Sequence, residues 1–194
     1  GGIVFQGNAK GEFNAYDDAT GKKLWSFYSK IGIIAPPVSY AIGDKQYVAV
    51  MVGYGGGYGV AGAFTEHAGP RPSSRLLVFA LGGKAPYKVE LAKPAPAVVV
   101  NMKWPDATVA HGAQIYETTC SVCHGGGAKS SGVLPDLRRS QVLKDPKLWQ
   151  QVVHDGLLKQ NGMAAFGKWL SPDDIEAVRG YVAGRAKVLS EKGI

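Results

Sequence analysis

Two cysteines and a histidine lie within five residues of one another, in the run Cys120-Ser121-Val122-Cys123-His124. A C-x-x-C-H run is the attachment signature of c-type haem. Two residues between the sulfurs let both thiols reach the vinyl groups of one macrocycle, and the adjacent imidazole is then held beneath the iron. The motif therefore predicts covalent haem on Cys120 and Cys123, with His124 as an iron ligand.

Other uses of a cysteine pair fit this motif less well. Structural zinc takes four ligands, and the chain has no second cysteine pair to complete a tetrahedron. A redox dithiol is typical of a βαβ pattern, and no such pattern surrounds the motif. A chance occurrence is the third alternative. Both cysteines of the chain belong to the motif, so no disulfide is available within it.

The sequence before the motif resembles the class I cytochrome c family. Gly112, Tyr116 and Cys120 follow one another at intervals of four, which places them on one face of a helix. A glycine on that face lets a second helix approach closely, and Tyr116 is expected to pack on it. The resemblance covers residues 101–190 and implies an all-α domain.

The sequence after the motif carries the same resemblance. Pro135-Asp136-Leu137 resembles the loop in which a proline carbonyl accepts the Nδ1–H of the proximal histidine, which strengthens that histidine as a ligand. Asn161–Gly167 resembles the distal methionine loop and implies Met163 as the sixth ligand of the iron. Histidine–methionine ligation raises the reduction potential. Ordinary packing is the alternative for Met163.

Arg138 follows the Pro135 loop directly. A guanidinium can donate two parallel hydrogen bonds to one carboxylate, so Arg138 is a candidate partner of a haem propionate. A solvated surface arginine is the equally weighted alternative. His154 stands beside an aspartate in a predicted helix and is expected to be a surface or packing residue.

The second half of the chain carries sequence signals for three helices. A helix over residues 106–118 leads into the cysteine motif. Asp145 as N-cap and Pro146 at the first position predict a helix to about Leu158. Ser171, followed by a proline and two acids, predicts the start of the last helix, whose apolar stripe contains Ile175, Val178, Tyr181 and Val182.

Length and charge limit the classes of protein that this chain fits. The chain has 194 residues and a formal net charge of +7, spread along the sequence without a basic run or a nucleic-acid motif. No apolar run reaches the length of a transmembrane helix. Because c-type haem is attached outside the cytoplasmic membrane, the cytochrome resemblance implies the periplasm. The first residues show no secretory signal, so either a signal was removed or a longer protein ends with this chain.

Residues 1–92 are predicted to be rich in short strands. Turn residues separate five apolar or aromatic segments, which predicts an antiparallel meander. The expected strands are Ile3–Gln6, Glu12–Tyr16, Lys23–Tyr28, Gln46–Val52 and Arg75–Leu81.

One hairpin in this half, Ala15–Trp25, resembles the tryptophan-docking motif of eight-bladed quinoprotein dehydrogenase propellers. Gly32–Pro37, Gln46–Gly57 and Arg75–Gly83 resemble the last-blade region of alcohol dehydrogenases that use pyrroloquinoline quinone (PQQ). A haem c domain after that blade is the arrangement of the quinohaemoprotein members. The chain is thus identified as the C-terminal part of a quinohaemoprotein alcohol dehydrogenase.

This resemblance implies a partial propeller over residues 1–92, a proline-rich linker over 93–105 and a class I cytochrome c domain over 106–194. A single docking motif cannot close a propeller, so the blade is expected to be stable only against the rest of one. The rest is either a separate polypeptide or an N-terminal part of the same one. The loop with Gly55, Gly56 and Gly57 is expected near the quinone, because glycine lets backbone approach a flat cofactor.

The implied function is a periplasmic enzyme that oxidises alcohols to aldehydes with PQQ and calcium, then passes electrons through haem c to a small redox protein or a quinone. No catalytic residue is expected in this chain, since the family's substrate-oxidising residues lie in earlier blades. Two alternatives remain open. The chain is a stand-alone electron carrier with a β interaction domain, or its enzyme acts on sugar alcohols or polymeric alcohols.

Overall fold

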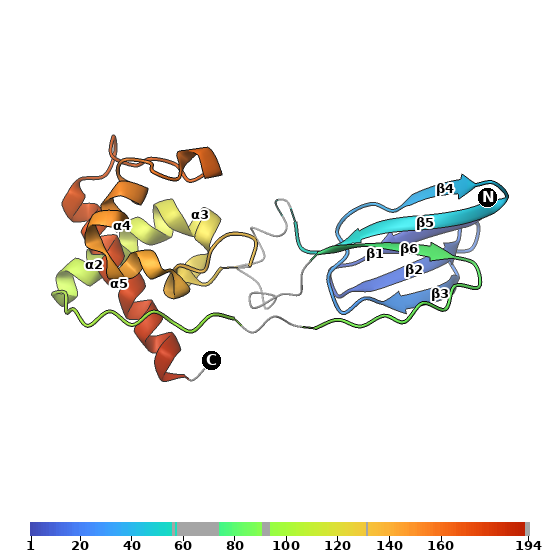
Figure 1. The fold of residues 1–194 in the computed structure, drawn as a ribbon, viewed down its shortest axis with the longest axis horizontal. Coiled ribbons are helices and arrows are strands. Elements are labelled where there is room, and N and C mark those ends of the chain that lie inside the picture. Colours follow the sequence, from blue (N-terminus) through green and yellow to red (C-terminus); the bar gives the residue numbers. More distant parts are fainter. Residues whose placement is uncertain (56, 58–73, 91–93, 131, 193–194) are drawn as a thin grey trace. The chain divides into compact units, whose positions relative to one another are not determined.

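The computed structural model describes residues 1–55, 57, 74–90, 94–130 and 132–192 (Figure 1). Of the predicted site residues, Gly56 alone lies outside these ranges. The described residues fall into two compact units. The first contains residues up to 57 together with 74–90, and the second contains residues from 94 onward. The exact domain boundaries stay a prediction.

The first unit consists of two antiparallel three-stranded sheets. In each sheet, the strands lie side by side in chain order. The first sheet contains β1 (Ile3–Gly7), β2 (Glu12–Asp17) and β3 (Lys23–Tyr28), and the second contains β4 (Val38–Ile42), β5 (Lys45–Val52) and β6 (Arg75–Ala80).

The five predicted strands are present with ends within about one residue of prediction. Strand β4 is an addition that the sequence reading missed. Val38, Tyr40 and Ile42 alternate ahead of a Gly43-Asp44 turn, which was the available signal. All five residues of β4 are exposed in this chain, so no core contact marks the strand.

Aromatic side chains on one face of the first sheet pack against the second sheet. Phe13 is fully buried and its ring lies 5.4 Å from that of Phe79 on β6. Trp25 and Phe27 meet the same Phe79 ring edge-on at 5.3 and 5.0 Å. Val50 completes this core from β5. Edge-to-face packing at these distances adds to the burial of area and fixes the two layers against each other.

The hairpin that carries Trp25 has the hydrogen bonds expected from its sequence. The Asp17 carboxylate accepts from the Thr20 backbone N–H at 2.8 Å and from its hydroxyl at 2.6 Å. Gly21 then takes a φ of +69°, a region that side-chain-bearing residues avoid. This turn returns the chain to β3 with Trp25 opposite Ala15.

The second unit is helical. It consists of three main helices, a short helix at the cysteine motif and single turns between them. The elements are α2 (Asp106–Ile115), a π-helical turn (Tyr116–Cys120), α3 (Ser121–His124), α4 (Pro146–Val153), α5 (Pro172–Glu191) and 3₁₀ turns at Gly126–Ala128, Leu137–Arg139, Gln141–Lys144 and Lys159–Asn161.

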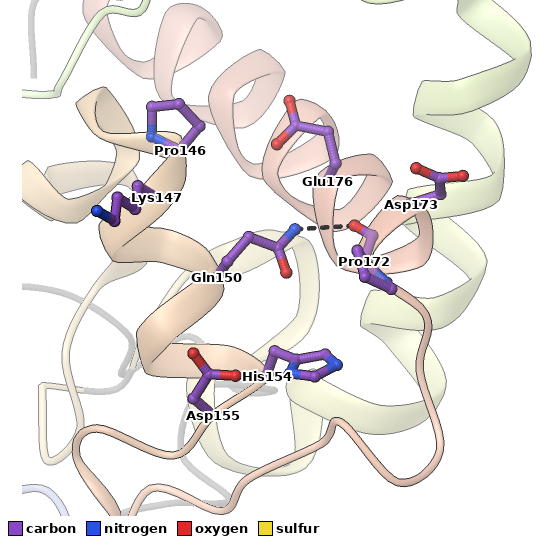
Figure 2. Close-up of a pocket in the computed structure, with 8 residues that line it drawn as sticks. All are labelled: Pro146, Lys147, Gln150, His154, Asp155, Pro172, Asp173 and Glu176. Carbon is purple, nitrogen blue, oxygen red and sulfur yellow. Dashed lines mark hydrogen bonds and ion pairs between the residues drawn. The ribbon is translucent and has the colours of Figure 1, made fainter.

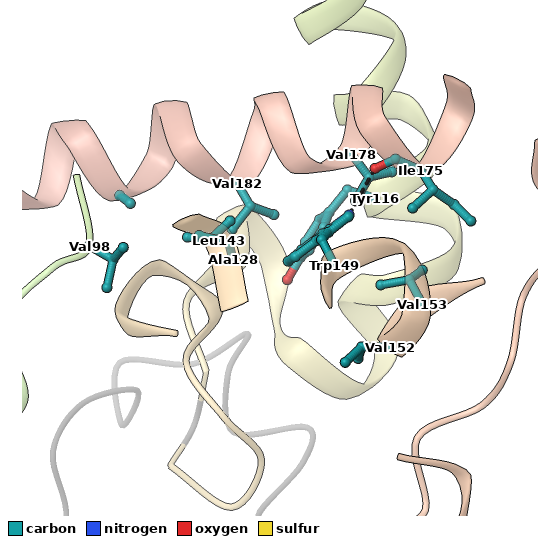
Figure 3. Close-up of a cluster of buried hydrophobic side chains, with 11 residues drawn as sticks. Val98, Tyr116, Ala128, Leu143, Trp149, Val152, Val153, Ile175, Val178 and Val182 are labelled. Carbon is teal, nitrogen blue, oxygen red and sulfur yellow. Dashed lines mark hydrogen bonds between the residues drawn. The ribbon is translucent and has the colours of Figure 1, made fainter. Parts of the chain in front are cut away.

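Helices α2 and α5 cross where glycine removes a side chain. A Cβ built on Gly112 would lie 2.0 Å from the carbonyl oxygen of Ala177, so only glycine permits this approach. The fully buried Tyr116 lies one turn further on and packs with Val178 and Val182 in the core of the unit (Figure 3). The expected close approach of a second helix at Gly112 is therefore present.

The helix starts agree with the sequence signals. The Asp145 carboxylate accepts from the backbone N–H groups of Lys147 and Leu148 at 2.9 and 3.0 Å, as an N-cap does. At the start of α5, Ser171 and Asp174 form a capping box, in which each side chain accepts from the other residue's backbone N–H.

The predicted end of α4 at Leu158 is wrong, because the helix ends at Val153. Gly156 takes a φ of +76°, and the N–H of Leu157 turns back to the carbonyl of Gln151 at 2.9 Å. A left-handed glycine just beyond the last turn ends a helix in this way. The residues that follow are then free to form the Met163 loop.

Gly112→Ala tests the helix crossing. The added methyl would overlap backbone rather than a movable side chain, so we expect a loss of unfolding free energy near the upper end of the usual ~1–3 kcal/mol for overpacking. Gly184→Ala on α5 is the matched control, because its Cβ meets nothing within 4 Å. It should stabilise by about 0.5–1 kcal/mol. Urea unfolding of the helical signal measures both. Equal stability of the two variants would contradict the crossing.

Asp174 also links α5 to α2, since its carboxylate accepts from His111 Nε2 at 2.7 Å. That bond, followed by those from Ser171, lowers the pKa of Asp174 from 3.8 to about 2. A lowered folded-state pKa contributes stability above the unfolded value and loses it as the pH falls through the folded value.

Asp174→Asn should therefore flatten the loss of stability between about pH 4 and pH 2. Chemical unfolding at several pH values across this window measures the slope. Asp173→Asn is the control, because Asp173 lies in the same helical turn and makes no hydrogen bond to the described residues. An unchanged slope in Asp174→Asn would show that the His111 contact contributes nothing.

Candidate functional site

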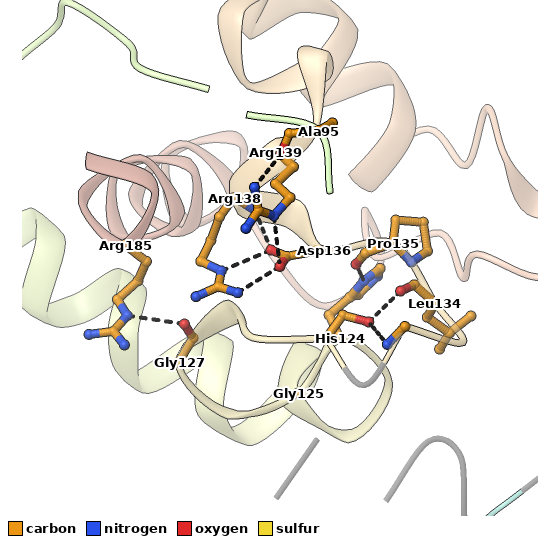
Figure 4. Close-up of polar contacts among 12 residues, drawn as sticks. Ala95, His124, Gly125, Gly127, Leu134, Pro135, Asp136, Arg138, Arg139 and Arg185 are labelled. Atoms are coloured by element: carbon orange, nitrogen blue, oxygen red, sulfur yellow. Dashed lines mark hydrogen bonds and ion pairs between the residues drawn. The ribbon is translucent and has the colours of Figure 1, made fainter. Parts of the chain in front are cut away.

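His124 is the last residue of helix α3 and is 8% exposed. Its Nδ1 lies 3.0 Å from the carbonyl oxygen of Pro135, the partner that the sequence predicted (Figure 4). A carbonyl only accepts, so Nδ1 carries the proton and Nε2 keeps its lone pair. Burial lowers the pKa of His124, outweighing the opposite effect of the Pro135 bond. The ring is thus held neutral, in the tautomer that binds a metal through Nε2.

The two cysteines have different surroundings. Cys120 ends the π-helical turn and packs against the apolar core, whereas Cys123 is exposed on α3. Neither forms a disulfide. Burial raises the pKa of Cys120 to about 12. A π-helical turn is often found at functional sites, and here it sets the direction from which the chain enters the motif.

Tyr116 holds the backbone at the end of the motif in place. Its hydroxyl donates to the carbonyl oxygen of Gly125 at 2.9 Å, and its ring lies 5.2 Å from that of Tyr181 on α5. Burial raises the pKa of Tyr116 far above its ordinary value, so the hydroxyl stays protonated and can donate. The backbone leaving His124 is therefore fixed to the helix-crossing core. The spacing of four predicted the packing of Tyr116, but no sequence signal predicted this hydrogen bond.

Met163 lies in a loop anchored at both ends. Its N–H donates to the carbonyl of Leu158 at 3.2 Å, and Phe166 N–H donates to the carbonyl of Val153 at 2.8 Å. Gly162, just before it, adopts the left-handed conformation with φ +91°. Met163 is half-buried and packs against the same apolar cluster as Cys120.

The remaining predicted residues have simpler surroundings. Arg138 directs its Nε and Nη2 to the Asp136 carboxylate at 2.9 and 2.6 Å, leaving Nη1 without a partner among the described residues. Gly55 and Gly57 are exposed, and a Cβ on either would meet nothing within 4 Å. No contact among the described residues therefore requires glycine at those two positions.

An open groove of about 520 Å³ lies elsewhere on the helical unit, between α4 and the start of α5 (Figure 2). It contains none of the predicted site residues. His154 lines it and contacts the Asp155 carboxylate at 2.7 Å, while Gln150 donates to the Pro172 carbonyl at 2.8 Å. These contacts agree with the expectation that His154 is a surface or packing residue, since its side chain is 33% exposed.

Within the described residues, no three histidine, cysteine, aspartate or glutamate side chains gather in a way that would hold a metal ion. Nor does that part of the chain contain a helix long and apolar enough to cross a membrane.

Comparison with known proteins identifies the architecture. Residues 107–182 match the family model of cytochrome c oxidase, cbb3-type, subunit III. The chain is 40% identical over 190 residues to quinohaemoprotein alcohol dehydrogenase ADH IIB of Pseudomonas putida, covering 95% of this chain and 27% of that protein. It is 41% identical to the dehydrogenase subunit of the quinone alcohol dehydrogenase of Gluconobacter oxydans, covering 96% of this chain and 25% of that protein.

A solved structure extends this likeness to three dimensions. The quinohaemoprotein alcohol dehydrogenase ADH IIG of Pseudomonas putida superposes with a TM-score of 0.78 at 33% identity, over 99% of this chain and 28% of that one. The chain is homologous to the C-terminal region of quinohaemoprotein alcohol dehydrogenases. These homologues are oxidoreductases that act on CH–OH groups. The chain spans only about a quarter of their length.

The comparison confirms the predicted fold class, a propeller-blade-like β fragment followed by a cytochrome c domain. A cytochrome c domain implies haem c, and the quinohaemoprotein family implies PQQ in the whole enzyme. The side chains fit haem c. Cys120 and Cys123 form no disulfide, and the Nδ1 of His124 is bonded to the Pro135 carbonyl while its Nε2 has no hydrogen bond to the described residues.

Proposed function

We propose that this chain is the electron-exit portion of a periplasmic alcohol dehydrogenase that uses PQQ, calcium and haem c. The whole enzyme oxidises alcohols to aldehydes and delivers the electrons to an external acceptor, either a small redox protein or a quinone. The observation that carries the proposal is the hydrogen bond from His124 Nδ1 to the Pro135 carbonyl, because it leaves the imidazole ready for iron.

Four side chains would hold the haem. Cys120 and Cys123 would bind it covalently through thioether bonds, while His124 and Met163 would be the two axial ligands. When bound, the haem supplies a one-electron carrier with a raised reduction potential. The chain's own part is to fix the imidazole, to exclude water with the apolar cluster and to keep the methionine loop closed. Arg138 Nη1 remains a candidate donor to a haem propionate.

The β unit contributes a blade to a larger propeller. The outer face of the second sheet is apolar and exposed in this chain, with Val38 at 61%, Leu76 at 58% and Val78 at 49%. An antiparallel sheet that faces water alternates apolar and polar residues instead. Such a face requires a further layer, which supports neighbouring blades as its partner.

PQQ and calcium belong to those neighbouring blades in this proposal. No residue of this chain is assigned to the oxidation of the alcohol itself. Gly55, Gly56 and Gly57 are proposed to lie near the quinone. The open space around Gly55 and Gly57 supports this, since no contact among the described residues explains the glycines there.

Two other functions remain as alternatives. A stand-alone electron carrier with a β interaction domain would share the haem chemistry, but the apolar outer sheet face argues against it. A quinohaemoprotein dehydrogenase for sugar alcohols or polymeric alcohols would share the whole fold. Substrate choice lies in a pocket outside this chain.

An anaerobic visible spectrum of the intact protein, loaded with PQQ and calcium, tests the proposal. Addition of a primary alcohol should produce the sharp bands of reduced c-type haem, because the quinone and the haem exchange electrons. Addition of a sugar alcohol separates the substrate classes. Bands that appear only with a chemical reductant would contradict the enzyme and favour the stand-alone carrier.

Met163→Leu tests the second axial ligand. Loss of the thioether should lower the reduction potential of the haem and let the reduced iron bind carbon monoxide, since histidine–methionine ligation keeps the potential high and the site closed. Redox titration and the carbon monoxide difference spectrum measure these effects. Met102→Leu is the control, because Met102 is 48% exposed and lies outside the loop. An unchanged potential in Met163→Leu would rule out this ligand.

A further inference from the structure

The Pro135 carbonyl belongs to the peptide unit that links Pro135 to Asp136. A peptide unit is planar, so whatever fixes the backbone of Asp136 also fixes the direction of that carbonyl. The Asp136 side chain is well placed to do this. Its Oδ1 accepts from the backbone N–H of Arg138 at 3.1 Å, which caps the short 3₁₀ turn Leu137–Arg139.

Arg138 closes the turn with a two-pronged contact. Its Nε donates to Asp136 Oδ1 at 2.9 Å and its Nη2 donates to Oδ2 at 2.6 Å. The two side chains are only 12% and 21% exposed. A bidentate, largely buried contact of this kind fixes orientation as well as position. A lysine cannot reproduce it, because an ammonium lacks the planar fork.

Hydrogen bonds to the segment before α2 also hold the turn in place. The carbonyl of Arg138 accepts from the N–H of Val98 at 2.8 Å, and Val98 is 3% exposed in the apolar core. Arg139 adds its Nε to the Asp136 carboxylate at 3.6 Å and donates through Nη1 to the carbonyl of Ala95 (Figure 4). The carboxylate thus ties the Pro135 turn to the segment before α2.

We propose that the Asp136–Arg138 pair positions His124. It holds the Pro135 carbonyl on the Nδ1–H of the imidazole and thereby sets the strength of that ring as a haem ligand. This inference rests on the proposed function, because it requires iron on the Nε2 side. Partners of a ligating histidine are known to tune its basicity and orientation in this manner.

The proposal predicts a direction for the reduction potential. A firm Nδ1–H···O bond makes the imidazole a stronger donor and favours oxidised iron. Loosening the turn weakens that bond and should raise the potential. A purely electrostatic effect would depend on charge instead, since removing the positive charge of Arg138 disfavours reduced iron and lowers the potential.

Three variants of the intact, haem-loaded protein separate these effects. Arg138→Lys keeps the charge but loses the fork, and Arg138→Gln loses both. The double variant Asp136→Asn with Arg138→Gln keeps the net charge of the pair at zero. Arg185→Lys is the matched control, because Arg185 donates to the Gly127 carbonyl and does not contact the Pro135 turn. Haem content and helical circular dichroism verify that each variant folds.

Redox titration of the haem gives the readout. We expect the potential to rise in Arg138→Lys and in the double variant, to rise less in Arg138→Gln because the lost positive charge opposes the effect, and to stay unchanged in Arg185→Lys. A fall in Arg138→Gln with no change in Arg138→Lys would overturn the proposal in favour of charge alone. Unchanged potentials throughout would also overturn it, while leaving the proposed function intact. If the wild-type protein carried no covalent haem, both this proposal and the proposed function would be contradicted.

Discussion

The imidazole of His124 has its place and its rotation fixed by different parts of the chain. Its place is set by the Cys-x-x-Cys-His spacing on α3, one residue beyond Cys123. Its rotation is set by the carbonyl of Pro135, eleven residues further on. Neither is sufficient alone, because the position of the backbone does not by itself choose the side-chain torsions of the ring. The loops and helices around the motif keep α3 and the Pro135 turn in contact.

The helix crossing provides the base for this arrangement. Gly112 brings α2 against the backbone of α5, and Tyr116 fills the space one turn later. Through its hydroxyl, Tyr116 then holds Gly125, the residue that follows His124. Gly112, Tyr116 and Cys120, which follow one another at intervals of four, therefore connect the helix crossing to the cysteine motif. In the β unit, the outer face of the second sheet is apolar and exposed among the described residues.

Local chemistry explains what the sequence predicted well. The caps at Asp145 and Ser171 and the turn at Asp17 depend on residues close in sequence, and all three are as expected. Features that depend on neighbours or on small changes in winding were missed. Strand β4 has no buried residue, the π-helical turn has no sequence signal, and α4 ends at Val153 because of Gly156. In the site, the Pro135 contact was predicted by resemblance, whereas the Asp136–Arg138 pair depends on side-chain geometry.

The most direct test of this account is mass spectrometry of the peptide that contains Cys120, Cys123 and His124. The protein should be produced in cells able to attach c-type haem, then unfolded and extracted with acid before digestion. We expect a peptide that keeps a haem through two thioether bonds, so that neither cysteine reacts with an alkylating agent. A peptide with two free, alkylated cysteines and no haem would contradict the account at its centre.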